Sequence, residues 1–377
     1  MTTQIKTRCE HCGQALGVAE TQFGTSVRCP ICDKEFVVSS VLFSKSGQPG
    51  QSAATAAPSE VGPGGGQTSN HQQADVLRNP ITGTNETIGR FQILGRLGGG
   101  TYGVVFHAYD PVLDRQLALK ILRFEADGPD VQDARRFQSE AKAAARLRHP
   151  GIVSIFETGQ TDGRYYIAAE YVEGTTLRAR IEAGVPPFSI TARWIAELAG
   201  AIDYAHAEGV VHRDLKPENI LLDTHERPQI LDFGLAKRLD EDSSLTTEGS
   251  ILGTPAYMSP EQARGDVGEV GPASDQYSLG AILYELLTGM KAFHGPPHAV
   301  VAQVAADDPP QPCTLNPNVP RDLEAICRQA MEKESARRYR NCGELAEDLQ
   351  RWLSGRETKA RPLGIVEQAV RWGRRRP

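Results

Sequence analysis

The sequence predicts an α+β fold in which strands come first and helices follow. Four apolar stretches rich in β-branched and aromatic residues predict strands, at 91–94, 104–109, 117–122 and 165–172. Two later stretches, 194–206 and 274–287, predict helices. The first carries its apolar side chains at helical spacing, and the second is apolar almost all round, which indicates a central, buried position. A block of strands followed by a block of helices is the pattern of an α+β protein.

The composition is that of a soluble globular protein. The chain has 377 residues, 40% hydrophobic and 23% charged, which is enough for two or three domains. Its formal net charge of −6 gives no reason to expect a specific nucleic-acid partner. The first ten residues are polar and no run of about 18 apolar residues occurs, so we expect neither a signal peptide nor a bilayer span. Seven cysteines in such a chain predict a reducing compartment and a cytoplasmic location.

Two cysteine pairs indicate a metal site in residues 1–42. Cys9 and Cys12 form one C-x2-C pair, Cys29 and Cys32 form a second, and sixteen residues separate the pairs. Four thiolates at this spacing can bind one tetrahedral Zn²⁺, and a segment this small needs a metal to fold. A disulfide pair or a redox C-x2-C site would fit the cysteines alone, but the cytoplasmic context and the lack of a βαβ pattern disfavour both. The segment resembles a zinc ribbon, with zinc in a structural role.

The next segment, 43–87, is predicted to be a flexible linker. It consists mainly of Gly, Ser, Gln, Ala, Thr, Asn and Pro, and it has no apolar periodicity. Such a segment buries too little apolar surface to offset the entropy lost on ordering, so we expect it to tether the first segment to the rest of the chain.

A glycine-rich stretch follows the first predicted strand of the folded region. Glycines at 98, 100 and 103 let the backbone approach phosphate oxygens and offer N–H donors. This spacing alone also fits a dinucleotide-binding turn, which requires a helix directly after the glycines. Residues 104–109 instead continue as a strand, so the sequence favours a glycine-rich hairpin.

Lys120 is the only charged residue in the apolar strand at 117–122. Because strand side chains alternate, Ala118 and Lys120 share a face, and Ala118 leaves room there for a flat base. A lysine in an apolar cleft needs a partner. The helix predicted at 131–147 supplies a candidate, because Glu140 sits beside its apolar stripe.

The stretch 212–219, which reads His-Arg-Asp-Leu-Lys-Pro-Glu-Asn, brings acidic, basic and amide side chains into one short loop. Pro217 can continue neither the hydrogen bonding of a strand nor a helix, so we expect a turn between short strands at 210–211 and 220–222. Asp214, Lys216 and Asn219 would then lie around one point. Asp232-Phe233-Gly234 follows, with its aspartate thirteen residues after Asn219.

In this order, the motifs resemble those of protein kinases, over residues 88 to about 353. The resemblance implies a two-lobed protein kinase fold, with a β-rich lobe at 88–172, a mainly helical lobe at 173–353, and ATP between them. Lys216, together with Thr254, points to serine/threonine rather than tyrosine kinases. The implied reaction transfers the γ-phosphoryl group of ATP to Ser or Thr hydroxyls of protein substrates. The best-fitting subgroup is a bacterial serine/threonine kinase with an amino-terminal zinc ribbon.

The resemblance also assigns roles to single residues. Asp214 would accept or orient the proton of the substrate hydroxyl, Lys216 would neutralise the γ-phosphoryl group, and Lys120 would pair with Glu140. Asn219 and Asp232 would bind Mg²⁺, for which Mn²⁺ can substitute. Glu170 and Val172 would offer backbone groups to adenine. The full set of implied ATP-binding residues is Leu97, Gly98, Gly99, Gly100, Thr101, Tyr102, Gly103, Val104, Val105, Ala118, Lys120, Glu170, Val172 and Leu221.

Residues 235–253 resemble an activation loop. Arg213 would pair with a phosphate on this loop, and we expect that phosphate on Thr246 or Thr247, added by autophosphorylation through self-association. An unmodified polar loop is the alternative. Thr254, in the segment that receives the substrate peptide, would contact Asp214 and Lys216.

Two further contacts concern the scaffold. Asp275 either caps its helix or, as in the family, anchors the backbone of the catalytic loop. By the same resemblance, Arg338 is the buried partner of Glu261.

The basic segment 354–377 leaves two interpretations open. It is either a solvated tail or a cluster suited to the cytoplasmic side of a membrane, so the chain is cytoplasmic or the cytoplasmic part of a membrane-anchored kinase. Two other functions compete with the kinase. A pseudokinase would normally lack Lys120, Asp214 or Asp232, and a small-molecule phosphotransferase would not need the peptide-receiving segment 253–261.

Overall fold

The structure is a computed structural model, and it describes residues 87–100, 103–125, 141–161, 163–233 and 255–361, together with four short strands near the amino terminus. The chain divides into two compact units, 1–72 and 73–377. Each unit is considered by itself below.

The first unit contains two antiparallel hairpins. β1 (Gln4–Arg8) pairs with β2 (Ala15–Ala19), and β3 (Ser26–Arg28) pairs with β4 (Glu35–Val37). The connection within the first hairpin contains Cys9 and Cys12 in the sequence, and that within the second contains Cys29 and Cys32. The four cysteines themselves lie outside the described residues, as does most of the predicted linker at 43–87.

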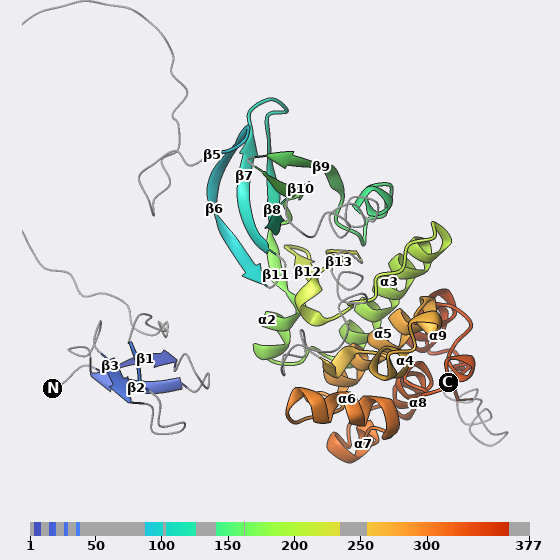
Figure 1. Ribbon diagram of the computed structural model, residues 1–377. Helices are drawn as coiled ribbons and strands as arrows, with labels where there is room; N and C mark the ends of the chain where they lie inside the picture. Colours follow the sequence, from blue (N-terminus) through green and yellow to red (C-terminus); the bar gives the residue numbers. More distant parts are fainter. Residues whose placement is uncertain are drawn as a thin grey trace, which may run out of the picture. The chain divides into compact units, whose positions relative to one another are not determined.

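The second unit begins with a six-stranded antiparallel sheet, which bends strongly in Figure 1. In chain order its strands are β5 (Thr87–Ile88), β6 (Phe91–Gly100), β7 (Gly103–Asp110), β8 (Arg115–Glu125), β9 (Ile155–Thr161) and β10 (Arg164–Glu170). They lie in the order β5-β6-β7-β8-β10-β9, so β7 and β8 are central and β10 is next to the edge strand β9. One face buries Phe91, Leu117, Leu119, Tyr166 and Ala168 in a core of its own. The four strands predicted from apolar stretches rich in β-branched and aromatic residues are all present, as β6, β7, β8 and β10.

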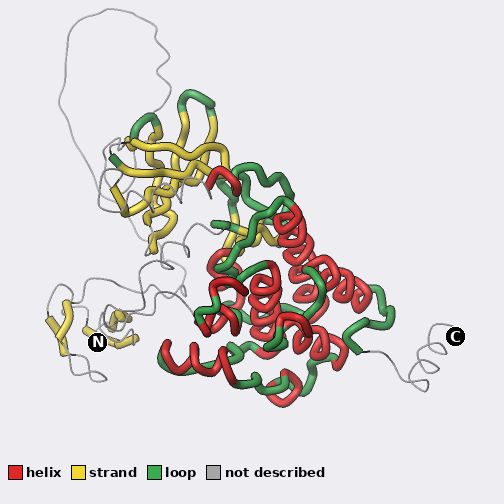
Figure 2. The backbone as a smooth tube through the Cα atoms, turned by 45° about the vertical axis from the view of Figure 1, so that its right-hand side comes forward, coloured by secondary structure: helices red, strands yellow, loops and turns green. Residues whose placement is uncertain are grey.

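The rest of the unit is mainly helical, and Figure 2 shows the helices gathered apart from the sheet. Its helices are α2 (Leu177–Glu182), α3 (Phe188–Ala207), α4 (Pro260–Arg264), α5 (Pro272–Thr288), α6 (Pro297–Ala306), α7 (Pro312–Leu315), α8 (Arg321–Ala330) and α9 (Cys342–Leu353). A small sheet of β11 (Gly174–Thr176), β12 (Ile220–Asp223) and β13 (Pro228–Ile230) lies between the larger sheet and the helices. Single 3-10 turns lie at Pro217–Asn219, Pro255–Tyr257, Val267–Glu269 and Ser335–Arg337.

Helix α5 is the centre of the helical lobe. All its residues from Ser274 to Leu287 are buried, as its apolar sequence predicts. Gly280 lets α8 approach closely, because a Cβ there would lie 2.8 Å from the Met331 side chain and 3.0 Å from Ala330 Cβ. None of the helices described here combines the length and apolar character needed to cross a bilayer.

The predicted strand at Val210 and Val211 is wrong. Neither residue belongs to a strand, whereas the strand predicted after the loop is present as β12. The amide of Val210 donates to the Ala205 carbonyl at the end of α3, so it is not available to a neighbouring strand. The next two amides, of His212 and Arg213, donate to the side chain of Asp275.

The described residues after Leu353, the last residue of α9, belong to the same fold up to Arg361, where the description ends. The carboxylate of Asp348 on α9 is fully buried and accepts hydrogen bonds from the amides of Lys359 (2.5 Å) and Ala360 (2.9 Å). The segment after α9 is therefore packed against that helix.

The predicted ion pair between Glu261 and Arg338 is confirmed. It is bidentate, with N–O distances of 2.9 and 2.8 Å, and both side chains are almost completely buried. Ser274 also donates to Glu261, at 2.7 Å. Burial alone would raise the pKa of Glu261, but the hydrogen bonds and charge of Arg338 lower it to about 2. The pair holds α4 against the start of α5 and the turn before α9.

Replacing Glu261 with Gln is expected to lower the free energy of unfolding by about 3–5 kcal/mol at pH 7, because the variant leaves the Arg338 charge buried without a partner. Since the folded carboxyl has a lowered pKa, its stabilising effect is present above pH 4.5 and disappears as the pH falls from there toward 2. The difference between wild type and Glu261→Gln should therefore shrink over that interval.

Urea unfolding at several pH values measures both effects. The double variant Glu261→Gln/Arg338→Met is the control and should recover part of the loss, because it removes both charges. A Glu261→Gln variant within about 1 kcal/mol of wild type at pH 7 would contradict the expected role of the pair.

Candidate active site

The loop at 212–219 is attached to α5 by the buried carboxylate of Asp275. One oxygen accepts the amide of Arg213 at 2.7 Å, and the other accepts the amide of His212 at 2.8 Å. The second oxygen also lies 2.8 Å from Nε2 of His206 on α3. Of the two roles predicted for Asp275, loop anchoring is the one observed. The Asp275 side chain does not cap the start of α5. Arg213 has a φ of +65°, a strained conformation that these contacts hold in place.

His212 connects the loop to the segment that carries Asp232. Its Nδ1 accepts the amide of Asp214 at 3.2 Å, so the proton lies on Nε2, which donates to the carbonyl of Leu231 at 2.9 Å. A second bond, from the amide of Leu231 to the carbonyl of Asn219, measures 2.9 Å. The ring of His212 also packs against Phe233, with centroids 4.9 Å apart. The two predicted motifs are therefore held side by side.

Asp214, Lys216 and Asn219 converge as the sequence predicts. The Lys216 ammonium lies 2.6 Å from Oδ2 of Asp214. The Asn219 amide nitrogen donates to the carbonyl of Asp214 at 2.9 Å and to the same Oδ2 at 3.3 Å. Both contacts use Oδ2, which leaves Oδ1 of Asp214 available for a further donor. The 3-10 turn that Pro217 begins brings Asn219 back toward Asp214.

Lys120 reaches this group from the β-rich lobe. Its ammonium forms an ion pair with Oδ2 of Asp232 at 2.8 Å. Desolvation raises the pKa of Asp232, but the charge and hydrogen bond of Lys120 outweigh it and lower the pKa below the usual value. Asp232 has a φ of +52°, and its side chain is 39% exposed and therefore accessible. The partner predicted for Lys120, Glu140, lies outside the described residues.

The oxygen atoms at this point suit a hard divalent cation. Asn219 bonds to Asp214 through its amide nitrogen and not through its Oδ1, and Asp232 supplies a carboxylate. Within the described ranges no cluster of three or more His, Cys, Asp or Glu residues is found. A set of one carboxylate and one amide is typical of Mg²⁺ that is also bound by substrate phosphates.

The glycine-rich hairpin has the predicted form. In the register of β6 and β7, Gly98 faces Val105, Gly99 faces Val104 and Gly100 faces Gly103. A Cβ on Gly103 would lie 2.2 Å from the carbonyl oxygen of Ile121, so only glycine fits there. Leu97 is 49% exposed, and Thr101 and Tyr102 are outside the described residues.

The strand predicted to contact adenine is β10. Ala169 lies opposite Ala118 of β8, so two small side chains are neighbours on adjacent strands, and Ala118 belongs to the same strand as Lys120. The Glu170 amide donates to the Ser154 carbonyl at 2.8 Å, which holds the end of β10 against the residue just before β9. Within the described part of the chain the backbone of Val172, just beyond β10, makes no hydrogen bond to another backbone group. Leu221, on β12, is half-buried opposite Thr176 of β11.

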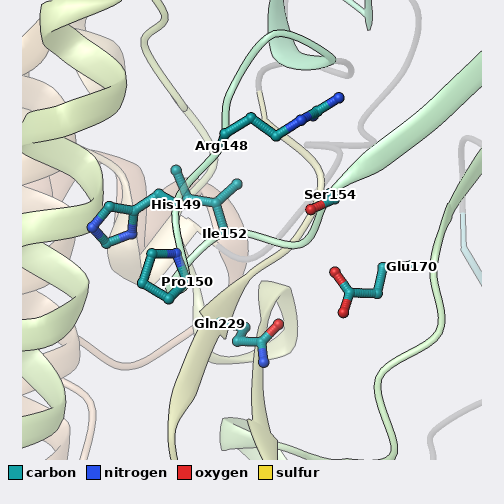
Figure 3. Close-up of a pocket in the computed structure, with 7 residues that line it drawn as sticks. All are labelled: Arg148, His149, Pro150, Ile152, Ser154, Glu170 and Gln229. Atoms are coloured by element: carbon teal, nitrogen blue, oxygen red, sulfur yellow. The ribbon is translucent and has the colours of Figure 1, made fainter.

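The Glu170 side chain lines a separate pocket of about 360 Å³. Figure 3 shows its other walls, which include Ser154, Ile152 and Gln229. The ring of His149 is turned away from this pocket and stacks on Tyr204 of α3. The pocket contains none of the residues predicted to act on phosphate.

Ten of the predicted site residues lie outside the described part of the chain: Cys9, Cys12, Cys29, Cys32, Thr101, Tyr102, Glu140, Thr246, Thr247 and Thr254.

Sequence reasoning missed one charged group next to the loop. Arg178 on α2 forms ion pairs with Glu218, within the loop, and with Glu285 on α5. The only sequence feature that pointed to this group is the position of Glu218 within the motif at 212–219. No local sequence pattern links Arg178 to its two partners, because Arg178 precedes Glu218 by 40 residues and Glu285 by 107.

Comparison with known proteins identifies the family. The model of the protein kinase domain family matches residues 91–362. The serine/threonine-protein kinase PrkC of Bacillus subtilis is 43% identical over 264 residues, which are 70% of this chain and 40% of PrkC. The serine/threonine-protein kinase PknB of Mycobacterium tuberculosis is 37% identical over 278 residues, 72% of this chain and 44% of PknB. The chain thus spans about two fifths of the length of these relatives.

Solved structures agree with this result. The crystal structure of the kinase domain of Mycobacterium tuberculosis PknI superimposes with a TM-score of 0.56 at 27% identity. The match covers 71% of this chain and 97% of that domain. With the converging Asp214, Lys216, Asn219, Lys120 and Asp232, these similarities show that the chain belongs to the protein kinase domain family, among bacterial kinases of the eukaryotic-like serine/threonine type.

Proposed function

We propose that this chain is a serine/threonine protein kinase that transfers the γ-phosphoryl group of ATP to Ser or Thr hydroxyls of protein substrates. The observation that carries the proposal is the convergence of one loop and two distant segments. Asp214, Lys216 and Asn219 share a loop, and Lys120 reaches Asp232 beside it from the other lobe. The relatives named above are serine/threonine kinases by name, which supports the same assignment.

Asp214 would act on the substrate hydroxyl. Its Oδ2 is used by Lys216 and Asn219, so Oδ1 is the atom that would accept a hydrogen bond from a Ser or Thr hydroxyl. That bond orients the oxygen toward the γ-phosphorus. As the new O–P bond forms, the bond from the γ-phosphorus to the bridging oxygen breaks, and the proton of the hydroxyl passes to Asp214. The products are a phosphoprotein and ADP, and the proton leaves to solvent.

The remaining charges of the site would balance those of the nucleotide. Asn219 Oδ1 and the Asp232 carboxylate would hold Mg²⁺, or Mn²⁺ in its place. Such an ion neutralises charge on the phosphates. Lys216 would offset negative charge on the transferring group, and Lys120, together with Glu140, would orient the other phosphates. The backbone groups of Glu170 and Val172 would hold adenine, as the family resemblance implies.

Two other functions fit part of the pattern. A pseudokinase scaffold would normally have lost a charged residue of the site, yet Lys120, Asp214 and Asp232 are all present. A small-molecule phosphotransferase would not need the segment 253–261, which resembles a peptide-binding element and includes Thr254.

Activation by phosphorylation of residues 235–253 is part of the proposal. The guanidinium of Arg213 has no hydrogen-bond or ion-pair partner within the described part of the chain, and its backbone is held by Asp275 and Gln262. A phosphate on Thr246 or Thr247 would give it one and would order the loop. Two copies of the chain would have to associate for one to phosphorylate the other.

Replacing Asp214 with Asn is expected to reduce transfer of ³²P from ATP to a generic protein substrate by about a hundredfold or more, because the variant loses the acceptor of the hydroxyl proton. ATP binding should remain within about twofold, since Asp214 is not among its proposed ligands.

Mass spectrometry of the wild-type product should find phosphate between residues 243 and 254.

A matched control is Asp266→Asn, which changes an exposed aspartate that pairs with Arg264 away from the loop. Transfer by Asp214→Asn equal to that of the control would exclude the proposed role. Transfer to a small molecule alone would select the phosphotransferase instead.

We also propose that residues 1–42 form a zinc ribbon, with Cys9, Cys12, Cys29 and Cys32 as ligands. The two hairpins of this unit support it, because each cysteine pair falls in the connection between two paired strands. Two such turns can supply four thiolates to one metal ion.

Metal analysis of the purified chain is expected to find one zinc ion per molecule and none in Cys9→Ser/Cys12→Ser. Cys313→Ser provides the control, because Cys313 is a free thiol in the helical lobe. Since zinc would supply the folding energy of this unit, its removal should make residues 1–42 sensitive to protease and leave the kinase domain resistant. Full zinc content in Cys9→Ser/Cys12→Ser would refute the ligand assignment.

The proposed organisation assigns residues 43–87 to a flexible tether and 88–353 to the kinase domain. The basic segment 354–377 would lie near the inner face of a membrane or in the cytoplasm. The part of this segment up to Arg361 packs on α9, so any membrane contact would involve later residues.

A further inference from the structure

Four side chains next to the catalytic loop form a compact charged group, here termed the Arg178 cluster: Arg178, Glu218, Tyr257 and Glu285. Arg178 donates from Nε to Glu218 at 2.9 Å and from Nη1 to Glu285 at 2.8 Å. Its Nη2 also contacts the Tyr257 hydroxyl. The Tyr257 hydroxyl donates to the other oxygen of Glu285 at 2.5 Å.

The cluster has more negative than positive charge. It combines two carboxylates with one guanidinium, and one oxygen of Glu218 is buried without a hydrogen-bond partner among the described residues. Burial would lower the pKa of Arg178, but its hydrogen bonds to Glu285 and Glu218 raise it, so the guanidinium is always charged. The Glu285 side chain is only 4% exposed, whereas that of Glu218 is 38% exposed. Solvent, or a bound peptide, can therefore reach the cluster from the Glu218 side.

The cluster adjoins both the catalytic loop and the turn that follows Thr254 in the sequence. Glu218 follows Asp214 by four residues in the same loop, and Tyr257 ends the 3-10 turn directly after Thr254. An extended peptide advances about 3.4 Å per residue. With its acceptor hydroxyl at Asp214, a residue a few positions away therefore comes within side-chain reach of Glu218.

We propose that Arg178 is a specificity-determining residue, which fills an acidic site beside the catalytic loop and so removes any need for a basic substrate side chain there. This inference rests on the proposed kinase function. Without Arg178, the carboxylates of Glu218 and Glu285 would face the peptide without a counter-charge. A substrate arginine could then take its place, because its guanidinium has the same planar set of donors.

A purely structural role for the cluster would explain its contacts, but it would not predict a preference for basic substrates when Arg178 is replaced. In both cases loss of Arg178 weakens the attachment of α2 to α5, since a buried carboxylate loses its partner. Only the specificity role predicts that the variant gains a preference for basic substrates, which separates the two.

Peptide substrates that carry Arg or Ala at each position around the acceptor test the proposal. Wild type should show Arg/Ala ratios of kcat/KM near one at the position that faces Glu218. In Arg178→Met the ratio at one position should increase about tenfold, the effect of one charge-assisted contact. Adding Glu218→Gln and Glu285→Gln to Arg178→Met should abolish the gain.

Ratios within about twofold of wild type at every position in folded Arg178→Met would overturn the proposal, as would a strong arginine preference in wild type. Should Arg178→Met fail to fold, Arg178→Lys serves instead. A lysine binds as a point charge and cannot bridge both carboxylates, so a smaller gain, about threefold, is expected at the same position.

A binding measurement separates this inference from the kinase assignment. Methylguanidinium ions should raise the Tm of Arg178→Met more than that of wild type, and this difference should vanish when Glu218→Gln and Glu285→Gln are added. An equal shift in Arg178→Met and wild type would refute the inference. If wild type phosphorylates no protein or peptide but the Tm difference is observed, the kinase function fails while the acidic site stands.

Discussion

The structure of the active site depends on one buried carboxylate. Asp275 belongs to the most deeply buried helix of the lobe, and it accepts hydrogen bonds from two consecutive loop amides and lies within bonding distance of His206. A charge in such a position is tolerated only because several donors surround it. Because the amides of His212 and Arg213 are bound to Asp275, the loop backbone is fixed relative to α5. The other contacts of the loop are made by a backbone that Asp275 already holds in place.

The anchor explains how charges from distant parts of the chain meet. With His212 and Arg213 held, Asp214 projects toward Lys216 and Asn219, and the His212 ring holds the segment before Asp232. Two residues with positive φ, Arg213 and Asp232, lie at the two ends of this arrangement. Strained backbone persists only where surrounding contacts determine it, and here those contacts serve to aim acidic side chains. Lys120 completes the group from the β-rich lobe.

Much of this site could be predicted from the sequence because its residues fall in short, contiguous motifs. Asp214, Lys216 and Asn219 are close in the chain, so a turn at Pro217 is enough to bring them together. The long apolar helix α5 and the strands were predictable for the same reason, since a local pattern determines them. The Glu261–Arg338 pair was found through family resemblance alone.

Contacts that depend on the packing of distant elements were not predictable. The pairing of Lys120 with Asp232 requires the two lobes to be placed against each other, and no local pattern contains that information. The Arg178 cluster joins α2, the loop and α5 in the same way. The predicted strand at Val210 and Val211 failed for a related reason: β-branched residues favour strands, but the amides that follow them bond to the Asp275 side chain.

Hydrogen exchange of the His212 and Arg213 amides tests the role of Asp275 most directly. The substitution Asp275→Asn keeps one acceptor oxygen and turns a donor toward the other amide, so one charge-assisted hydrogen bond is lost. Exchange of these amides in Asp275→Asn should be about ten- to a hundredfold faster than in wild type, while the amides of α5 keep their protection. Unchanged exchange at His212 and Arg213 would contradict the anchoring role of Asp275.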